Sequence, residues 1–230
     1  MRVSLAVVVL VGAVCLGLAF GGSWRRLASL PLRWLSLVVL VAAIALAAAR
    51  GGRWSRLAHL QLRSRGLIAA AVVAQAGGAL VGIAGFGDAR KAYVSGLVVS
   101  AACALWFCAR NLRIPGVALV SAGLVANAAV VALNGAMPVS IVAAYHARVP
   151  IGAISAGTDA RHEIAGLGTR MRWLGDVVPV PLPLRPEVVS VGDLLVAAGL
   201  AELVVMGMMG SVPHRKEIPH GEEGAQASGA

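Results

Sequence analysis

Long apolar runs separated by short polar segments dominate the chain. Six runs stand out, at residues 3–20, 34–49, 66–84, 92–109, 115–133 and 191–210. A helix needs about 20 apolar residues, each adding about 1.5 Å, to cross the hydrocarbon core of a bilayer. The pattern therefore predicts an all-α fold, a polytopic transmembrane helix bundle of about six helices.

The run at residues 34–49 is the shortest of the six. It lies between Arg33 and Arg50, and as a helix it covers only about 24 Å. To span, it would need its flanking arginines to reach back to the headgroups, or the bilayer to thin locally. If it is re-entrant instead, five helices span and the N-terminus moves to the other side.

A stretch at residues 134–190 breaks the apolar pattern and is too long for a simple connector. We expect it to form a long, partly structured loop outside the membrane. The polar tail from residue 211 onward should be disordered. The expected units are residues 1–50 (N-terminal helices), 51–133 (bundle core), 134–190 (loop), 191–210 (last transmembrane helix) and 211–230 (tail).

A basic segment occurs twice, after the first and the second apolar run. Residues 21–33 read GGSWRRLASLPLR and residues 51–63 read GGRWSRLAHLQLR, which match at nine of thirteen positions. In each copy a tryptophan, a leucine and arginines fall close together on a helix, as in a short segment that lies among lipid headgroups. Anchoring at the membrane surface explains the repeat without any chemistry.

Composition supports a membrane environment. The chain is 59% hydrophobic and 13% charged, whereas soluble domains carry about 25% charged residues. The net charge of +10 comes mostly from arginines between the apolar runs, so we expect lipid phosphates and no nucleic acid as the partner. Cys15, Cys103 and Cys108 lie inside apolar runs, and we expect no disulfide framework, no metal and no cofactor.

Basic residues in short loops predict the topology. With the N-terminus inside, ten Lys and Arg lie in inner segments against five in outer short loops. Both termini should then be cytoplasmic and the long loop outside. Lysine is rare beside abundant arginine, alanine, valine and glycine, which is typical of high-GC bacterial genomes and favours the bacterial cytoplasmic membrane.

Three motifs resemble a known family. The chain reads NAAVVALNGAMPV at residues 127–139, LGDVVPVPLP at 174–183 and SVGDLL at 190–195. Together they are similar to a family of uncharacterised bacterial multi-pass membrane proteins, classed as a domain of unknown function. The resemblance covers about residues 51–210 and implies an integral membrane location and no established activity. It draws attention to Asn134, Gly135, Met137, Pro138 and Gly175.

Polar side chains within apolar runs are costly and often functional. Glu202, Gln75 and Asn127 lie inside three such runs, and we expect them to meet at similar depth. A protonated glutamate that only glues helices together is one interpretation; proton coupling or ligand binding is the other. Asn134 should begin a turn that ends the fifth helix, because Gly135 and Pro138 follow it.

The loop holds the sequence TDARHEI at residues 158–164. Asp159, His162 and the more distant Asp176 could act as acid and base groups, since histidine titrates near neutral pH. A single histidine fits no metal signature. A short capped helix that begins at Thr158 or Asp159 and ends near residue 166 or 168 explains the same letters without catalysis.

Asp176 precedes prolines that should keep residues 179–186 extended, as a strip that could lie across the helix ends like a lid. Ser190 and Asp193 have the spacing of a capping box at the start of the last helix. Capping alone accounts for both residues. We nevertheless keep them among the candidates for binding or coupling.

Three functions remain open. The first is a non-enzymatic membrane module that binds a small ligand or an envelope partner through the loop, as a monomer or a homo-oligomer. The second is a membrane-embedded enzyme acting on an envelope lipid or peptide, with Asp159, His162 and Asp176 as its acid and base groups. The third is a small proton-coupled transporter that uses Glu202.

Overall fold

The computed structural model describes residues 34–83, 88–157, 159, 161–182 and 186–211. Three expectations lie outside these residues: the first apolar run, the first copy of the basic repeat, and the tail from residue 212. Within the described ranges the chain is mostly helical.

Five long helices match the remaining five apolar runs to within three residues at either end. They are α3 (Trp34–Ala49), α5 (Gly66–Ile83), α6 (Ala89–Asn111), α7 (Val117–Asn134) and α10 (Val191–Met209). By length and composition, three helices could cross a membrane: Lys91–Asn111, Val117–Asn134 and Val191–Met209. Shorter apolar helices occupy Trp34–Ala49 and Gly66–Gly78. These features indicate a membrane protein.

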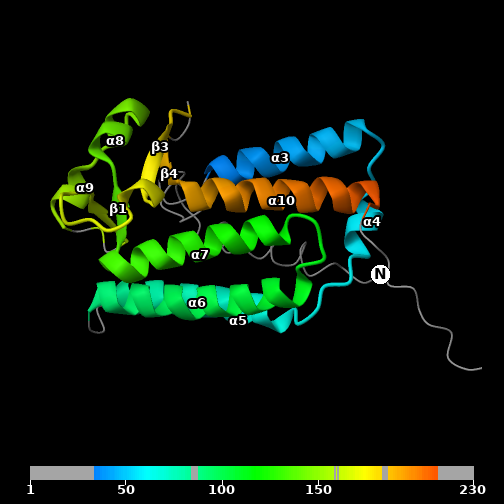
Figure 1. Cartoon of the computed structure of the whole chain (residues 1–230), viewed down its shortest axis with the longest axis horizontal. Coiled ribbons are helices and arrows are strands. Elements are labelled where there is room, and N and C mark those ends of the chain that lie inside the picture. Colours follow the sequence, from blue (N-terminus) through cyan, green and yellow to red (C-terminus); the bar gives the residue numbers. More distant parts are fainter. Residues whose placement is uncertain (1–33, 84–87, 158, 160, 183–185, 212–230) are drawn as a thin grey trace, which may run out of the picture.

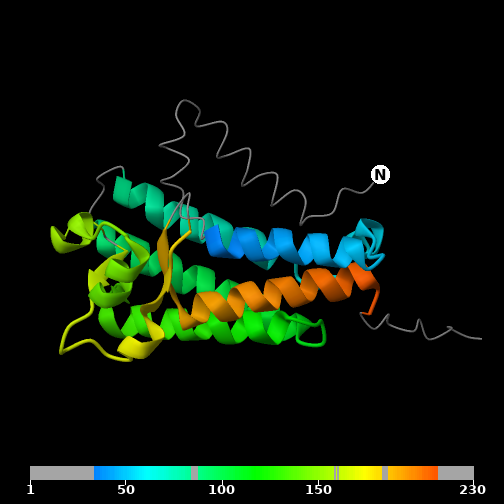
Figure 2. The same cartoon turned by 90° about the horizontal axis from the view of Figure 1, so that it is seen from above.

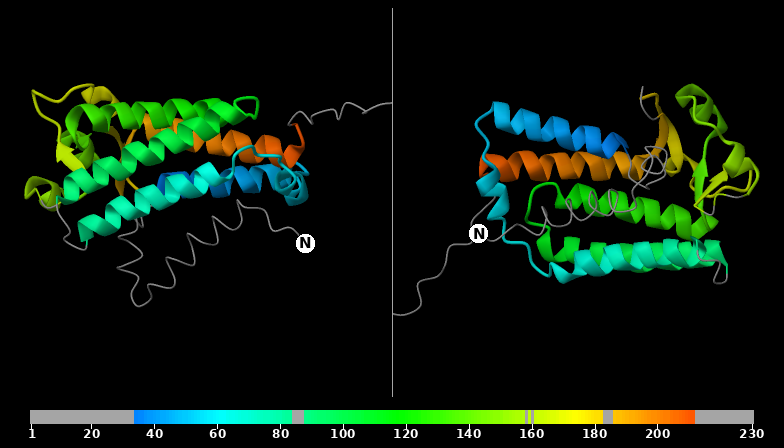
Figure 3. Two further views of the ribbon diagram at one scale, coloured as in Figure 1. Left: turned by 90° about the horizontal axis from the view of Figure 1, so that it is seen from below. Right: turned by 180° about the vertical axis from the view of Figure 1, so that it is seen from behind.

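The long helices lie in one row, in the order α3, α10, α7, α6, α5 (Figure 1). Figure 2 shows that α3 and α5 are displaced to the same side of α10 and α7, so the row is curved. Successive neighbours from α10 to α5 are antiparallel, and α3 runs parallel to α10 along its whole length (Figure 3). The helix α3 therefore reaches from one end of the row to the other and does not turn back.

Glycines bring α7 and α10 into backbone contact at two levels. A Cβ atom added at Gly199 would lie 2.5 Å from the carbonyl oxygen of Gly116, and one added at Gly123 would lie 2.4 Å from that of Gly192. Small residues allow such close approach between helices in membranes. The helices α5 and α6 approach closely in the same way, since a Cβ added at Gly78 of α5 would lie 2.6 Å from the carbonyl oxygen of Ala92 on α6.

The second copy of the basic repeat forms the short helix α4 (Trp54–Ala58) at the C-terminal end of α10. Arg56 Nη1 donates a hydrogen bond to the Met209 carbonyl oxygen at 3.0 Å, and the Arg53 backbone N–H donates to the Met208 carbonyl at 2.9 Å. Leu57 packs beside Met208. The segment thus satisfies orphan carbonyls at the end of a helix.

The stretch before α10 contains a small mixed sheet, so the expectation of an all-α fold was wrong. Its strands are β1 (Met137–Val139), β2 (His162–Ile164), β3 (Asp176–Val180) and β4 (Glu187–Ser190), in the order β2-β1-β3-β4. β1 pairs in parallel with β2 and β3, and β3 pairs antiparallel with β4. The helices α8 (Ile141–Ala147) and α9 (Gly152–Ser155) and the 3-10 turn η1 (Arg172–Leu174) complete this sheet segment, residues 135–190.

Two local expectations within the sheet segment change. Residues 162–164 form β2, and the expected capped helix is absent because their backbone pairs with Met137–Val139 and Asp159 accepts the Arg161 N–H instead of capping a helix. Asp176–Val180 is extended as expected, but as a strand paired with β4 rather than as a free strip. The apolar side of α8 covers the sheet, with Ala143, Ala144 and Ala147 against Val139 and Val188.

Candidate functional site

A polar cluster joins the last part of α7 to the first turn of α10. Asn127 Nδ2 donates to Asp193 Oδ1 at 2.9 Å, and Ser190 Oγ donates to Asn127 Oδ1 at 2.8 Å. The predicted capping box is confirmed, because Ser190 Oγ accepts the Asp193 N–H while the Asp193 carboxylate accepts the Ser190 N–H. We call Asn127, Ser190 and Asp193 the junction.

The sheet continues directly from the junction. Ser190 is fully buried and pairs with Asp176, which in turn pairs with Val139 of β1. The Asp176 carbonyl oxygen accepts the Ser140 N–H at 2.9 Å. Gly175 is required just before Asp176, since a Cβ there would lie 2.4 Å from the Pro138 carbonyl oxygen. The Gly-Asp pair therefore lets β3 approach β1.

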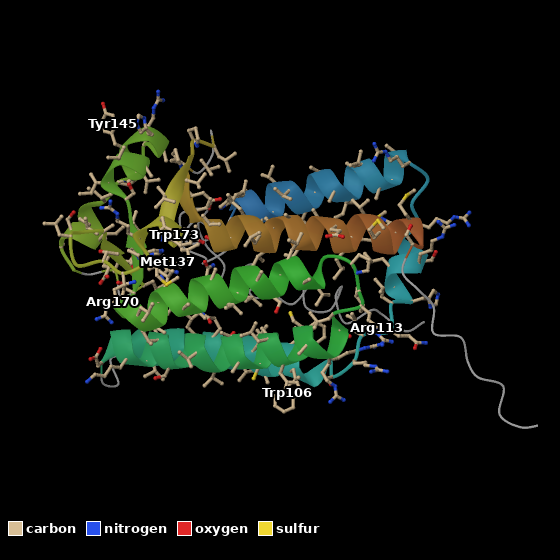
Figure 4. The ribbon with its side chains drawn as sticks, viewed as in Figure 1. Trp106, Arg113, Met137, Tyr145, Arg170 and Trp173 are labelled. Atoms are coloured by element: carbon tan, nitrogen blue, oxygen red, sulfur yellow. The ribbon has the colours of Figure 1, made fainter. Side chains whose placement is uncertain are left out.

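The Asn-Gly step after α7 ends the helix as predicted. Gly135 has φ of +80°, a left-handed conformation that suits glycine at a helix C-terminus. The Asn134 side chain makes two hydrogen bonds to the Arg170 backbone: Oδ1 accepts the Arg170 N–H at 2.9 Å, and Nδ2 donates to the Arg170 carbonyl oxygen at 3.0 Å. Met137 is buried against Val130 and Val131 of α7, between the sheet and the bundle (Figure 4).

Residues far apart in sequence thus meet at one end of the row. The structure brings together Asn127, Asn134, Gly135, Met137, Pro138, Gly175, Asp176, Ser190 and Asp193. All of them come from the three motifs that carry the family resemblance. The motifs therefore describe the connection between sheet and helices.

The expected meeting of Glu202, Gln75 and Asn127 was wrong. Asn127 binds Asp193, and Glu202 lies nine residues further along α10, about 14 Å away along the axis. Glu202 is exposed, and Gln75 belongs to α5 at the opposite edge of the row. Within the described part of the chain these three side chains do not meet, because the described long helices lie in a row.

Asp159, His162 and Asp176 do come together, as the enzyme hypothesis requires. His162 Nδ1 lies 2.9 Å from Asp159 Oδ2, and its Nε2 lies 3.7 Å from Asp176 Oδ2. Burial raises the pKa of the Asp159 carboxyl, but the hydrogen bond and charge of His162, with the backbone N–H and charge of Arg161, lower it more, to about 2. An ionised Asp159 therefore holds the ring in place.

We call Asp159, His162 and Asp176 the histidine cluster, and its access from solvent is limited. The His162 side chain is 21% exposed, while that of Asp176 is 2% exposed. Each ring nitrogen faces the carboxyl group of an aspartate. General acid or base action on a substrate would have to take place at Nε2, whose distance to Asp176 exceeds a hydrogen bond.

A polar hollow of about 540 Å³ opens beside the end of α7. It is lined by Leu133, Asn134, Glu163, Ile164, Gly166, Gly168, Thr169 and Arg170. Among these residues Glu163, Thr169 and Arg170 carry a carboxylate, a hydroxyl and a guanidinium. Such a set suits a ligand that carries both charges.

Sequence reasoning missed Thr169 and Arg170, because no spacing links them to Asn134. It also missed Glu187, which is buried and accepts hydrogen bonds from the backbone N–H groups of Trp34 and Leu35. A carboxylate at a helix N-terminus is stabilising. Glu187 thereby attaches α3 to β4 across 152 residues of sequence. No local sequence pattern predicts a contact over that separation.

The two ends of the row differ in charge. At the end away from the sheet the described residues include Arg50, Arg53, Arg56, Arg63, Arg65, Arg110 and Arg113. None of the aspartates and glutamates in the described ranges lies there; we call it the arginine end. Trp106 is 63% exposed nearer this end and Trp173 is 64% exposed beside the sheet (Figure 4).

These features indicate a mostly helical membrane protein with a small sheet built onto the ends of its helices. The chain belongs to a family of unknown function, DUF5317, whose profile matches residues 59–205. The match includes the junction, the histidine cluster and the hollow, and begins after α3. No curated protein and no solved structure matches the chain.

Proposed function

We propose that the protein is a multi-pass module of the bacterial cytoplasmic membrane, with the arginine end inside and the sheet segment outside. Five described helices and the apolar run at residues 3–20 would make six spans. The arginine end has seven arginines and no aspartate or glutamate among the described residues. This charge supports the proposed orientation, because cytoplasmic loops carry an excess of Lys and Arg. Exposed tryptophans toward both ends suit the two interfaces of a bilayer.

Cysteine labelling tests the orientation. Ser155 is exposed in the sheet segment and Leu112 is 54% exposed at the arginine end. In a chain without its native cysteines, Ser155→Cys should react with an impermeant thiol reagent in intact cells. Leu112→Cys should react only after lysis. The reverse pattern would place the sheet in the cytoplasm.

The sheet segment is proposed to bind a small ligand with both charges, or an envelope partner that presents the same groups. The observation that carries this proposal is the polar hollow, in which Glu163, Thr169 and Arg170 line one surface at the end of α7. Amino acids, short peptides and zwitterionic headgroups have the matching chemistry. Binding sites are typically concave with a few convergent polar groups.

Binding at the hollow would reach the helices through the junction. Asn134 holds the Arg170 backbone and ends α7. Asp176 and Ser190 pair on the way to Asn127 and α10. A ligand that shifts the sheet would therefore act on both helices, and no catalytic step is needed.

A thermal unfolding screen of the full chain in detergent tests ligand binding. The probes are free amino acids, dipeptides and zwitterionic glycerophosphodiester headgroups at millimolar concentration. At least one should raise the unfolding temperature, because a ligand that binds only the folded state stabilises it. Arg170→Gln should abolish the shift, whereas Arg113→Gln, an exposed arginine at the opposite end, should leave it intact.

Two results would contradict the binding proposal. One is that no probe changes the unfolding temperature of the wild-type chain. The other is a shift that survives Arg170→Gln and Glu163→Gln, which would place binding elsewhere.

An enzyme is the second candidate, and the convergence of Asp159, His162 and Asp176 favours it. Here His162 would move a proton to or from an envelope lipid or peptide. Mass spectrometry of envelope lipids and peptidoglycan fragments should then differ between cells with wild-type chain and cells with His162→Ala. His146→Ala, an exposed histidine on α8, is the matched control. Identical profiles for all three would remove the enzyme hypothesis.

A further inference from the structure

One face of α10 is exposed, with none of the other described helices packed against it. Gly192 and Gly199 face α7, while Val204 and Met208 face α3. A third face carries Leu194, Ala198 and Glu202 at four-residue spacing, and all three are exposed. These residues form one stripe along the helix, because residues four apart lie one above the other. We call them the glutamate stripe.

Glu202 is the one carboxylate within the apolar part of the described long helices. It makes no hydrogen bond or ion pair with any residue in the ranges that the structure describes. It lies seven residues before the end of α10, about 10 Å inside the arginine end. If α10 spans a bilayer, as proposed above, the stripe faces hydrocarbon, where an unpaired ionisable group is costly.

We propose that the glutamate stripe is the contact surface for a second copy of this chain. Copies inserted by the same route share one orientation, so a two-fold axis runs along the membrane normal. Such an interface brings each residue opposite the same residue of the partner at equal depth. The two Glu202 side chains then meet, and Ala198 is small enough to let the helices approach.

A protonated carboxyl both donates and accepts hydrogen bonds, so a pair of Glu202 side chains is self-complementary. Polar side chains that bond across helices hold membrane helices together. The cost of the buried carboxyl is thereby offset in the dimer and not in the monomer.

The apolar run at residues 3–20 is a poorer match for this face. Its hydrogen-bonding side chains are Ser4, at the start of the run, and Cys15, whose thiol is a weak donor. Neither has the depth of Glu202 when the run is laid along α10 from the arginine end. A second copy supplies the required group at the required depth.

Dimerisation in liposomes tests the proposal, measured by single-molecule photobleaching of the full labelled chain at decreasing protein density. The wild-type chain should dimerise. Glu202→Leu should weaken the dimerisation constant by about tenfold, the size of an interhelical hydrogen bond in a membrane. Glu202→Gln should retain dimerisation to within about threefold, because an amide also donates and accepts.

Disulfide cross-linking locates the interface. In a chain without native cysteines, Ala198→Cys should form a dimer on mild oxidation. Val73→Cys, 70% exposed on α5 at the far edge of the row, should not. If Cys15 is restored, it should not join to Ala198→Cys within one chain.

A wild-type monomer, or equal dimerisation of wild type and Glu202→Leu, would overturn the proposal. A disulfide between Cys15 and Ala198→Cys within one chain would overturn it in favour of the N-terminal run. Retention of the chain in membranes after alkaline carbonate washing tests the membrane location separately. Loss of the dimer with retention in the membrane therefore refutes this inference alone.

Discussion

Asn127 should be coupled energetically to Ser190, and a double-mutant cycle can measure the coupling. Ser190 Oγ donates a hydrogen bond to Asn127 Oδ1 at 2.8 Å, and Ser190 is fully buried. Asn127→Ala removes this acceptor and also the bond to Asp193. Ser190→Ala removes the same bond together with the helix cap of α10. The double variant loses every one of these contacts but leaves no orphaned partner between positions 127 and 190.

The structure sets the expected sizes. Loss of the charge-assisted bond to Asp193 and of the partner of a buried hydroxyl should cost Asn127→Ala about 2–4 kcal/mol of unfolding free energy. Ser190→Ala should cost about 1–2 kcal/mol through the cap, and more through Asn127. Because orphaned groups contribute to both single variants, the double variant should be about 1–2 kcal/mol more stable than their sum predicts.

Reversible unfolding of the detergent-solubilised chain by added dodecyl sulfate, followed by circular dichroism, gives the four free energies. Asn111→Ala is the matched control, because Asn111 is 4% exposed and holds the Arg63 backbone at the arginine end. Asn111 lies about 25 Å from Ser190 along the helices. The losses of unfolding free energy in Asn111→Ala and Ser190→Ala should therefore add to within about 0.5 kcal/mol. Additivity of Asn127→Ala and Ser190→Ala to the same precision would refute the junction as a coupled unit.

Two further predictions concern packing and pH. Gly199→Ala should destabilise the chain by about 1–3 kcal/mol, because the added methyl group clashes with the Gly116 backbone. Gly77→Ala should not, because a Cβ there meets nothing within 4 Å. Equal unfolding temperatures for the two variants would contradict the close approach of α7 and α10. The pKa of Asp159 falls from 3.8 to about 2 in the folded chain, so its contribution is present above about pH 4 and is lost as the pH falls toward 2. His162→Ala should reduce that loss in acid-unfolding curves, and an unchanged slope would exclude the pairing.

The sequence predicted the long helices well because each is determined by a local property. An apolar run of sufficient length must form a helix where no water is available to the backbone. The ends were predicted where a specific residue causes them. Gly135 ends α7 in the left-handed conformation, and Ser190 with Asp193 begins α10 as a capping box.

The sheet could not be predicted because its causes are not local. β1 has three residues and contains Pro138, which cannot donate a hydrogen bond and is rare in central strands. It is tolerated because β1 pairs with β3 only at Val139, so no donor is needed at the proline. The arrangement of the described helices in a row could not be predicted from the sequence either. We expected a closed bundle in which Glu202 and Asn127 meet, and in the row they do not.

If the sheet segment binds a ligand as proposed, α7 and α10 are the direct route from the sheet to the other helices, because both helices continue directly into strands. Two residues separate α7 from β1, and none separates β4 from α10. Glycines keep the backbones of α7 and α10 in direct contact. No flexible side chains lie between the two backbones there that could adjust if Ser190 moved relative to Asn127, to which it is hydrogen-bonded. On ligand binding we therefore expect Ser190 and Asn127 to move together, and Glu187 links β4 to α3 as well. If the glutamate stripe of α10 binds a second copy, the same motion reaches the dimer interface, and ligand binding and dimerisation become linked.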